Sequence, residues 1–134
     1  MKIVDVLWIE DDSAFVDGTL ANFKEDRDEL GFAIVPWHYV SKKDFEENSH
    51  MELDALHMGL VCVDYHLPGG INGNEIIVKI RSYAANSNID IVFYSAIKNE
   101  IELKEMLEAE LADLTNIYFA HKDTLEDRIH SLLA

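Results

Sequence analysis

The chain has 134 residues, of which 49% are hydrophobic, and 26 acidic against 11 basic side chains give a formal net charge of −15. This length suits one domain with a sizeable buried core, and the hydrophobic content argues against a disordered chain. Binding to nucleic acid requires a basic face, which so acidic a sequence does not offer, so we expect no direct DNA or RNA partner.

Cysteine usage and the length of the apolar runs bear on the cellular compartment. Cys62 is the only cysteine, so no intrachain disulfide can form, and a reducing compartment is favoured. The longest apolar runs have the length of strands, so the sequence predicts neither a secretory signal nor a membrane span. We therefore expect a cytoplasmic protein with no membrane partner.

Strands and helices alternate along the chain. Apolar or β-rich runs predict strands at Ile3–Ile9, Phe32–Val40, Leu60–Tyr65, Ile89–Tyr94 and Asn116–Ala120. A helix is expected after each of them. Pro36 cannot donate to a sheet ladder, which places the second strand at an edge. The alternation predicts the α/β class, a single (βα)5 doubly wound domain with a parallel sheet that fills residues 1–134.

Helix starts and apolar stripes can also be read from spacing. Capping pairs are expected at Ser41 with Asp44, Asn99 with Glu102, and Asp123 with Glu126. The helix after Ser41 is expected to reach about His57. The stripes of the next two helices are expected to be formed by Ile76, Ile77, Ile80 and Tyr83, and by Ile101, Leu103, Met106, Leu107, Leu111 and Leu114.

Chemically matched side chains follow four of the predicted strands. Glu10 and Asp11 follow the first, Asp64 ends the third, Ser95 follows the fourth and Lys122 follows the fifth. Parallel strands end at one edge of a sheet, where open α/β folds bind ligands, so these groups would converge. Clustered carboxylates suit Mg²⁺, and an aspartate beside bound Mg²⁺ can act as a nucleophile that forms an aspartyl phosphate.

This set of residues, in this order, resembles a response-regulator receiver domain of two-component signalling, with its CheY-like, flavodoxin-like fold. The resemblance covers essentially the whole chain and implies a five-stranded sheet of order 2-1-3-4-5. It implies that Asp64 is the phosphoacceptor. It also implies a Mg²⁺ site in which Asp11 and Asp64 bind directly, Glu10 acts through water, and the main-chain carbonyl of His66 is a further ligand.

The same resemblance implies the remaining roles and the partners. Lys122 would contact the phosphoryl group, Ser95 would be the switch hydroxyl, with the small Ala96 leaving room, and Phe119 would be the switch aromatic. The expected partners are a histidine kinase or phosphotransfer protein and an output protein or fused effector domain. The chain would accept and hydrolyse its own aspartyl phosphate and would not be a turnover enzyme.

The sequence departs from the family pattern at several points. The loop between Asp64 and Gly73 is one residue longer than usual, the stretch from Ser95 to Lys122 is longer than typical, and Asp123 stands where the family has proline. Asp12 could also replace Asp11 in the acidic pair. These departures leave open a receiver-fold interaction module that works without phosphorylation.

Two other functions are disfavoured by single residues. A phosphatase with an aspartyl intermediate usually has a second acid two residues after the nucleophile, where this chain has His66. Cys62, Asp64 and His66 alternate in a way that could suggest a zinc site, but zinc needs at least three good ligands. Cys62 is expected to point into the core instead.

Overall fold

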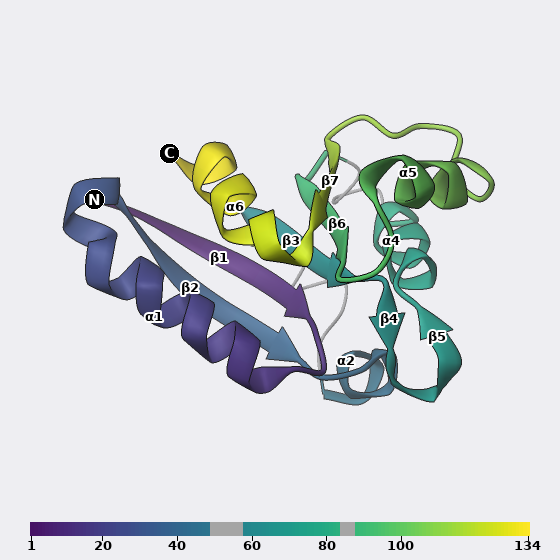
Figure 1. Ribbon diagram of the computed structural model, residues 1–134, viewed down its shortest axis with the longest axis horizontal. Coiled ribbons are helices and arrows are strands. Elements are labelled where there is room, and N and C mark those ends of the chain that lie inside the picture. The colour runs from purple at the N-terminus through teal and green to yellow at the C-terminus, as the bar shows by residue number, and fades with distance from the viewer. Residues whose placement is uncertain (49–57, 84–87) are drawn as a thin grey trace.

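Five parallel strands form the central sheet of the computed structural model, which describes residues 1–48, 58–83 and 88–134 (Figure 1). They are β1 (Lys2–Ile9), β2 (Phe32–Tyr39), β3 (Leu60–Asp64), β6 (Ile91–Ser95) and β7 (Ile117–His121). Their order, β2-β1-β3-β6-β7, is the predicted order 2-1-3-4-5. The described helices are α1 (Ser13–Leu30), α2 (Lys42–Asn48), α4 (Asn74–Arg81), α5 (Glu100–Glu108) and α6 (Leu125–Leu133).

The helices cover both faces of the sheet, and each face has its own apolar core. Helices α1 and α6 pack on one face, and they lie in front of the sheet in Figure 1. That core includes Val6, Trp8, Val16, Phe23, Cys62, Tyr94, Leu125 and Ile129. Helices α2, α4 and α5 pack on the opposite face, over Ile9, Phe45, Val63, Ile77, Ile80, Phe93, Leu103 and Leu107. The predicted doubly wound α/β fold is therefore confirmed.

The sheet register puts the ends of the central strands at one level. Ile9 pairs with Val63 and Tyr39, Asp64 pairs with Tyr94, and Ser95 pairs with His121. The residues that follow these strands therefore share one edge. Strand β2 lies at the side of the sheet, as Pro36 predicted.

A small hairpin interrupts the usual passage from strand to helix after β3. Strands β4 (His66–Leu67) and β5 (Ile71–Asn72) pair antiparallel, joined by a turn of 3-10 helix, Pro68–Gly70. Gly69 and Gly70 both have positive φ, 79° and 71°, a conformation that glycine adopts at little cost. The extra residue noted in this loop is thus contained in a hairpin that returns the chain to Gly73.

The capping predictions have mixed outcomes. Asn99 and Glu102 form the predicted capping box at the start of α5, and the Ser41 hydroxyl accepts the N–H of Asp44. The pair Asp123 and Glu126 was predicted wrongly. Helix α6 begins only at Leu125, because the ring Nδ1 of His121 accepts the N–H of Asp123 and holds Lys122–Thr124 as a 3-10 turn.

Helix ends also differ from the expectations. Helix α4 ends before Tyr83, which therefore lies outside the predicted helical stripe. Helix α5 ends before Leu111 and Leu114, which pack against the core from outside the helix. Ile101 is 71% exposed and does not belong to the core stripe of α5. Helix α2 is described only to Asn48, so its predicted end near His57 lies outside the described residues. No described helix has the length and apolarity needed to cross a bilayer.

A pair of glycine substitutions tests the packing beneath this edge. A Cβ on Gly73 would overlap the main-chain oxygen of Asp64 and lie 2.8 Å from Cγ1 of Val63, whereas one on Gly18, in α1, meets nothing within 4 Å. Gly73→Ala is expected to lower the free energy of unfolding by about 1–3 kcal/mol. Gly18→Ala is expected to raise it by about 0.5–1 kcal/mol. Urea denaturation measures both, and equal effects would contradict the close packing at Gly73.

Candidate functional site

Asp64 ends the central strand β3 and is only 6% exposed. Strands β1 and β6 flank it, so its carboxylate is surrounded by protein. Burial raises the pKa of Asp64 to about 8, the nearby Glu10 carboxylate adds to this, and Lys122 and the His66 main-chain N–H act in the opposite direction. The folded chain thus holds a carboxyl group that is costly to ionise without a neighbouring cation.

Glu10 is fully buried at the end of β1 and is fixed at both its main chain and its side chain. Its N–H donates to the carbonyl of Tyr39 at 3.0 Å, and the His38 ring Nε2 donates to its carbonyl at 2.7 Å. Its Oε2 accepts the N–H of Asp12 at 3.0 Å, and its Oε1 lies 3.2 Å from Lys122 Nζ. A glutamate in this position has little freedom to reorient.

The structure brings Glu10, Asp11 and Asp64 together, with one oxygen of each lying within 4.8 Å of the others. Within residues 1–48, 58–83 and 88–134 they form the only such group of potential metal ligands. The donors are all carboxylate oxygens, which suit a hard divalent cation, and their mutual repulsion would be relieved by one. These residues therefore fit a divalent metal.

Asp12, the alternative to Asp11, has a different place. Its Oδ1 accepts the N–H of Phe15 at 3.1 Å and so caps α1, and its Oδ2 lies 3.4 Å from Lys122 Nζ. It does not belong to the metal-ligand group. The geometry thus places Asp11, and not Asp12, beside Asp64.

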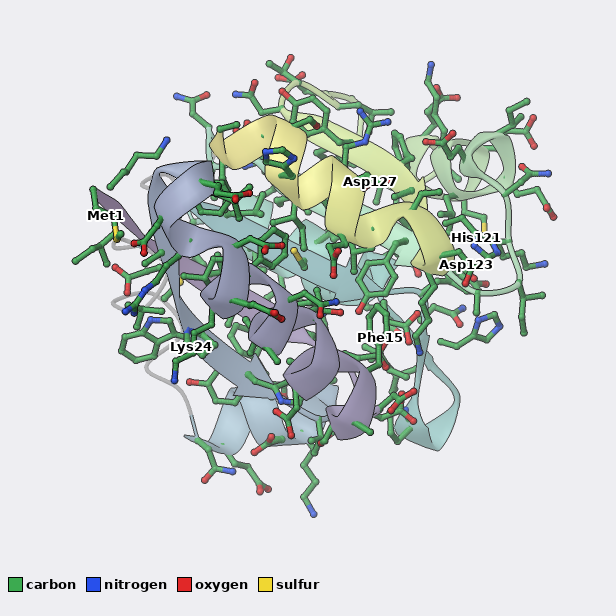
Figure 2. All side chains as sticks on the ribbon, turned by 60° about the vertical axis from the view of Figure 1, so that its left-hand side comes forward. Met1, Phe15, Lys24, His121, Asp123 and Asp127 are labelled. Atoms are coloured by element: carbon green, nitrogen blue, oxygen red, sulfur yellow. The ribbon has the colours of Figure 1, made fainter. Side chains whose placement is uncertain are left out.

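Lys122 reaches back from the end of β7 across the site. Its Nζ contacts Glu10 and Asp12 and lies 4.6 Å from the centre of the Phe15 ring. Figure 2 shows the Phe15 end of α1 near the segment of His121 and Asp123 that leads into α6. Partial burial lowers the pKa of Lys122, but Glu10 and Asp12 raise it more, so the net change is upward and the ammonium stays charged.

Ser95 is fully buried, and its hydroxyl already has two donors. The main-chain N–H groups of Ile97 and Lys98 donate to Oγ at 3.0 and 2.9 Å. A serine hydroxyl has two acceptor lone pairs and one hydrogen, so its own O–H remains for a further acceptor. Ser95 thus holds the loop before α5 and can still donate to a group at the sheet edge.

The remaining predicted residues lie around this centre. The His66 side chain is exposed and points to no described metal group, so only its predicted carbonyl role is left to consider. Phe119 is half-buried on β7, packs against the core beneath α5, and has its ring centre 6.4 Å from that of Phe93. Cys62 lies in the core beneath α1 and α6, as predicted, which leaves the zinc alternative without its thiolate.

Sequence reasoning missed a buried polar chain behind Glu10. The indole Nε1 of Trp8 donates to the Tyr94 hydroxyl at 2.8 Å, and that hydroxyl donates to Glu10 Oε1 at 3.1 Å. Burial and the two carboxylates of Glu10 and Asp64 raise the pKa of Tyr94 well above its ordinary value, so it remains a donor. The available signal was a tyrosine in a strand buried on both faces, because a buried tyrosine hydroxyl usually needs a partner.

A second contact that the sequence did not predict joins the end of β7 to the loop after β6. The ring Nε2 of His121 donates to the carbonyl of Ala96 at 3.0 Å, since its Nδ1 is already an acceptor for the N–H of Asp123. The end of β7 is thereby tied to the loop that follows Ser95. Movement of one loop would therefore disturb the other.

Comparison with solved structures identifies the fold. A signal receiver domain of a DNA-binding response regulator from Colwellia psychrerythraea 34H matches with a TM-score of 0.64 at 21% identity, covering 96% of this chain and 97% of that one. Chemotaxis response regulator CheY4 of Vibrio cholerae matches with a TM-score of 0.65 at 11% identity, over 98% and 100% of the two chains. The chain has the fold of a response-regulator receiver domain.

A third receiver-fold neighbour is the Mn²⁺-bound form of response regulator Rcp1, with a TM-score of 0.61 at 15% identity, covering 96% of this chain and 91% of that one. No protein-family model matches the sequence. A comparison with curated proteins finds no match either. The likeness therefore rests on the receiver fold, and the function must be argued from the residues at its edge.

The raised pKa of Asp64 predicts how stability depends on pH in EDTA. Folded Asp64 keeps its proton up to about pH 8, whereas an unfolded aspartate loses it near pH 4, so the free energy of unfolding should fall between these values and then level off. Asp64→Asn should remove this fall and be more stable than wild type at pH 9, by up to a few kcal/mol.

Urea denaturation of both proteins from pH 5 to pH 9 measures this difference. Asp17→Asn, on the exposed face of α1, is the matched control and should follow wild type throughout. A constant difference between Asp64→Asn and wild type across the range would contradict the raised pKa.

Proposed function

We propose that residues 1–134 form a receiver domain whose Asp64 accepts a phosphoryl group, in the presence of Mg²⁺, from a histidine kinase or phosphotransfer protein. The observation that carries this proposal is the buried Asp64 carboxylate at the end of β3, beside Glu10 and Asp11 and across from Lys122. Glu10 and Asp11 follow β1, Asp64 ends β3 and Lys122 follows β7, so three strands contribute to the group. A purely structural aspartate would not require such neighbours.

In this proposal Glu10, Asp11 and Asp64 hold the cation, together with the main-chain carbonyl of His66. Glu10 acts through water, because its oxygens already have protein donors. Bound Mg²⁺ supplies positive charge that offsets both the crowded carboxylates and the oxygens of an incoming phosphoryl group. One solved neighbour of the same fold, response regulator Rcp1, is a Mn²⁺-bound form, which supports a divalent cation as the ligand of this acidic group.

The proposed reaction transfers a phosphoryl group from a histidine nitrogen of the donor to a carboxylate oxygen of Asp64. An ionised oxygen of Asp64 attacks the phosphorus, a new O–P bond forms, and the N–P bond to the donor imidazole breaks. The imidazole leaves with the electron pair and takes up a proton from water. Lys122 turns from Glu10 and Asp12 toward the phosphoryl oxygens, and the free O–H of Ser95 donates to another of them.

The product is the phosphorylated chain itself, which acts as a signal, and no metabolite is released. The chain hydrolyses its own aspartyl phosphate and has no turnover on external substrates. An output protein or a fused effector domain reads the change in the cytoplasm. The alternative, a receiver-fold interaction module that works without phosphorylation, is separated from this proposal by the first experiment below.

Acetyl phosphate with Mg²⁺ should add one phosphoryl group to the wild-type chain, as measured by intact mass. The added mass should disappear in EDTA and in Asp64→Asn, which keeps the shape of the side chain but removes the nucleophile. Asp11→Asn should slow the addition, because it removes a metal ligand, and Asp17→Asn should leave it unchanged. Mg²⁺-dependent phosphorylation that persists in Asp64→Asn would contradict the assignment, and no phosphorylation of wild type would favour the interaction module.

The switch proposed to follow involves Ser95 and Phe119. The phosphoryl group adds negative charge and acceptor oxygens, which draw the Ser95 hydroxyl inward and move the loop that it holds. Phe119, now half-buried, can then turn fully inward. Full burial of a phenylalanine side chain contributes about 1.5–3 kcal/mol relative to full exposure, and the half-buried Phe119 would gain only part of this, on the order of 1 kcal/mol, which still biases a two-state element. The surface that changes is formed by α5, β7 and α6.

Hydrogen exchange with and without beryllofluoride, a phosphoryl mimic, tests this switch. Protection should change in Ile97–Glu105 and in Asn116–Ala120 of wild type. Ser95→Ala should still accept a phosphoryl group at Asp64 but show little change in either segment. Ser95→Thr keeps the hydroxyl and is the matched control, expected to switch like wild type. Unchanged protection of both segments in wild type would remove this mechanism while leaving the phosphorylation proposal intact.

A further inference from the structure

We propose that Tyr94 is a positioning residue for the metal site: its hydroxyl, oriented by Trp8, holds the Glu10 carboxylate in the place where the site needs it. This inference rests on the proposed function, because it concerns the same cation. It assigns a role to a side chain on the face of the sheet beneath α1 and α6, outside the set of strand-end residues. Tyr94 itself does not touch the cation.

The direction of the hydrogen bonds is fixed by chemistry. An indole nitrogen can only donate, so the Tyr94 oxygen must accept from Trp8 Nε1 at 2.8 Å. The single Tyr94 hydrogen is then left for Glu10 Oε1, at 3.1 Å. Trp8, Tyr94 and Glu10 are each fully buried, so water cannot replace a missing partner cheaply.

The need for Tyr94 comes from the second partner of the same oxygen. Glu10 Oε1 is also 3.2 Å from Lys122 Nζ, but the proposed function requires Lys122 to turn toward the phosphoryl group. Once it has turned, Tyr94 is the side chain that still donates to Oε1. Asp12 holds the other oxygen only through its main-chain N–H. Tyr94 therefore holds the Glu10 carboxylate in the same position before and after Lys122 turns toward the phosphoryl group.

The experiment measures Mn²⁺ binding to the full chain by the loss of the free-ion electron paramagnetic resonance signal, with Mg²⁺ as competitor. Tyr94→Phe removes one oxygen and is expected to weaken binding of both ions about tenfold, since outer residues that orient metal ligands typically contribute 10–100-fold. Tyr118→Phe removes the same group from a half-buried tyrosine on β7 that packs against the same core but pairs with Val92, and it should bind like wild type. Circular dichroism establishes that each variant is folded at the titration temperature.

A double-mutant cycle separates positioning from a general effect on the fold. In a Glu10→Gln background, Tyr94→Phe should cause no further loss of Mn²⁺ affinity, because Tyr94 acts through that carboxylate. A tenfold loss in that background as well would overturn the inference, as would unchanged affinity in Tyr94→Phe alone. A lower melting temperature of the metal-free protein with unchanged affinity would mean a structural role only.

The control Asp11→Asn distinguishes failure of this inference from failure of the metal site. If wild type binds Mn²⁺, Asp11→Asn does not and Tyr94→Phe binds like wild type, only the role of Tyr94 is overturned. If wild type and Asp11→Asn bind equally, or neither binds, the proposed metal site and the role of Tyr94 both fail.

Discussion

Repulsion between buried carboxylates at one edge of the sheet is the constraint on which the site depends. Glu10 is fully buried and Asp64 nearly so, and each would be destabilised by the other if both were ionised without a cation. The folded chain limits this cost by leaving a proton on Asp64 and by placing the Lys122 ammonium against Glu10. Charge at this edge is therefore balanced only in part. An additional cation, or a group that redistributes the existing charges, would change the electrostatic energy of Glu10, Asp64 and Lys122 together.

Many hydrogen bonds to uncharged groups gather around the same residues. Glu10 is fixed by the carbonyl of Tyr39, the His38 ring and the Tyr94 hydroxyl. Ser95 is fixed by two loop N–H groups, and His121 ties the last strand to that loop. Buried polar groups that keep all their partners have one preferred arrangement, so a small movement of one member must be shared by its neighbours. The apolar cores on the two faces supply the rigid support against which such a movement occurs.

The sequence predicted the fold because its strongest signals are local. Strand-length apolar runs alternate with helical stripes, and Pro36 marks an edge strand. The fold class and the edge position of the second strand could therefore both be derived from the sequence. Strand ends also follow from the pattern, which is why Glu10, Asp11, Asp64, Ser95 and Lys122 were expected at one edge. The order of the strands came from the resemblance to receiver domains, since periodicity does not determine which strands are neighbours.

Contacts between residues far apart in the chain could not be predicted from the sequence. Nothing in the pattern pairs Trp8 with Tyr94, and Asp12 looked like an alternative metal ligand until its two oxygens were seen to cap α1 and contact Lys122. Asp123 had the spacing of a helix cap, but the ring of His121, two residues earlier, accepts its N–H and forms a 3-10 turn instead. Ile101 matched a helical stripe, yet no element covers it among the described residues. Tyr94 and Lys122 are far from Trp8 and Asp12 in the sequence, whereas His121 is only two residues from Asp123 and competed with a different local rule.

The hairpin after β3 affects which substitutions and insertions this chain can accept as its sequence diverges. Its two glycines adopt left-handed backbone conformations at an exposed tip, and the paired strands β4 and β5 below them bring the chain back together. Insertions and deletions there are absorbed outside the sheet, as the additional residue already is. Gly73, a few positions later, lies against the main chain of Asp64, where even one methyl group has no room. Substitution is thus restricted at three glycines for two different reasons: Gly69 and Gly70 hold positive φ, which a side chain would strain, whereas Gly73 lacks the space for a Cβ. Of these positions, only the exposed tip at Gly69 and Gly70 leaves room for a change in loop length.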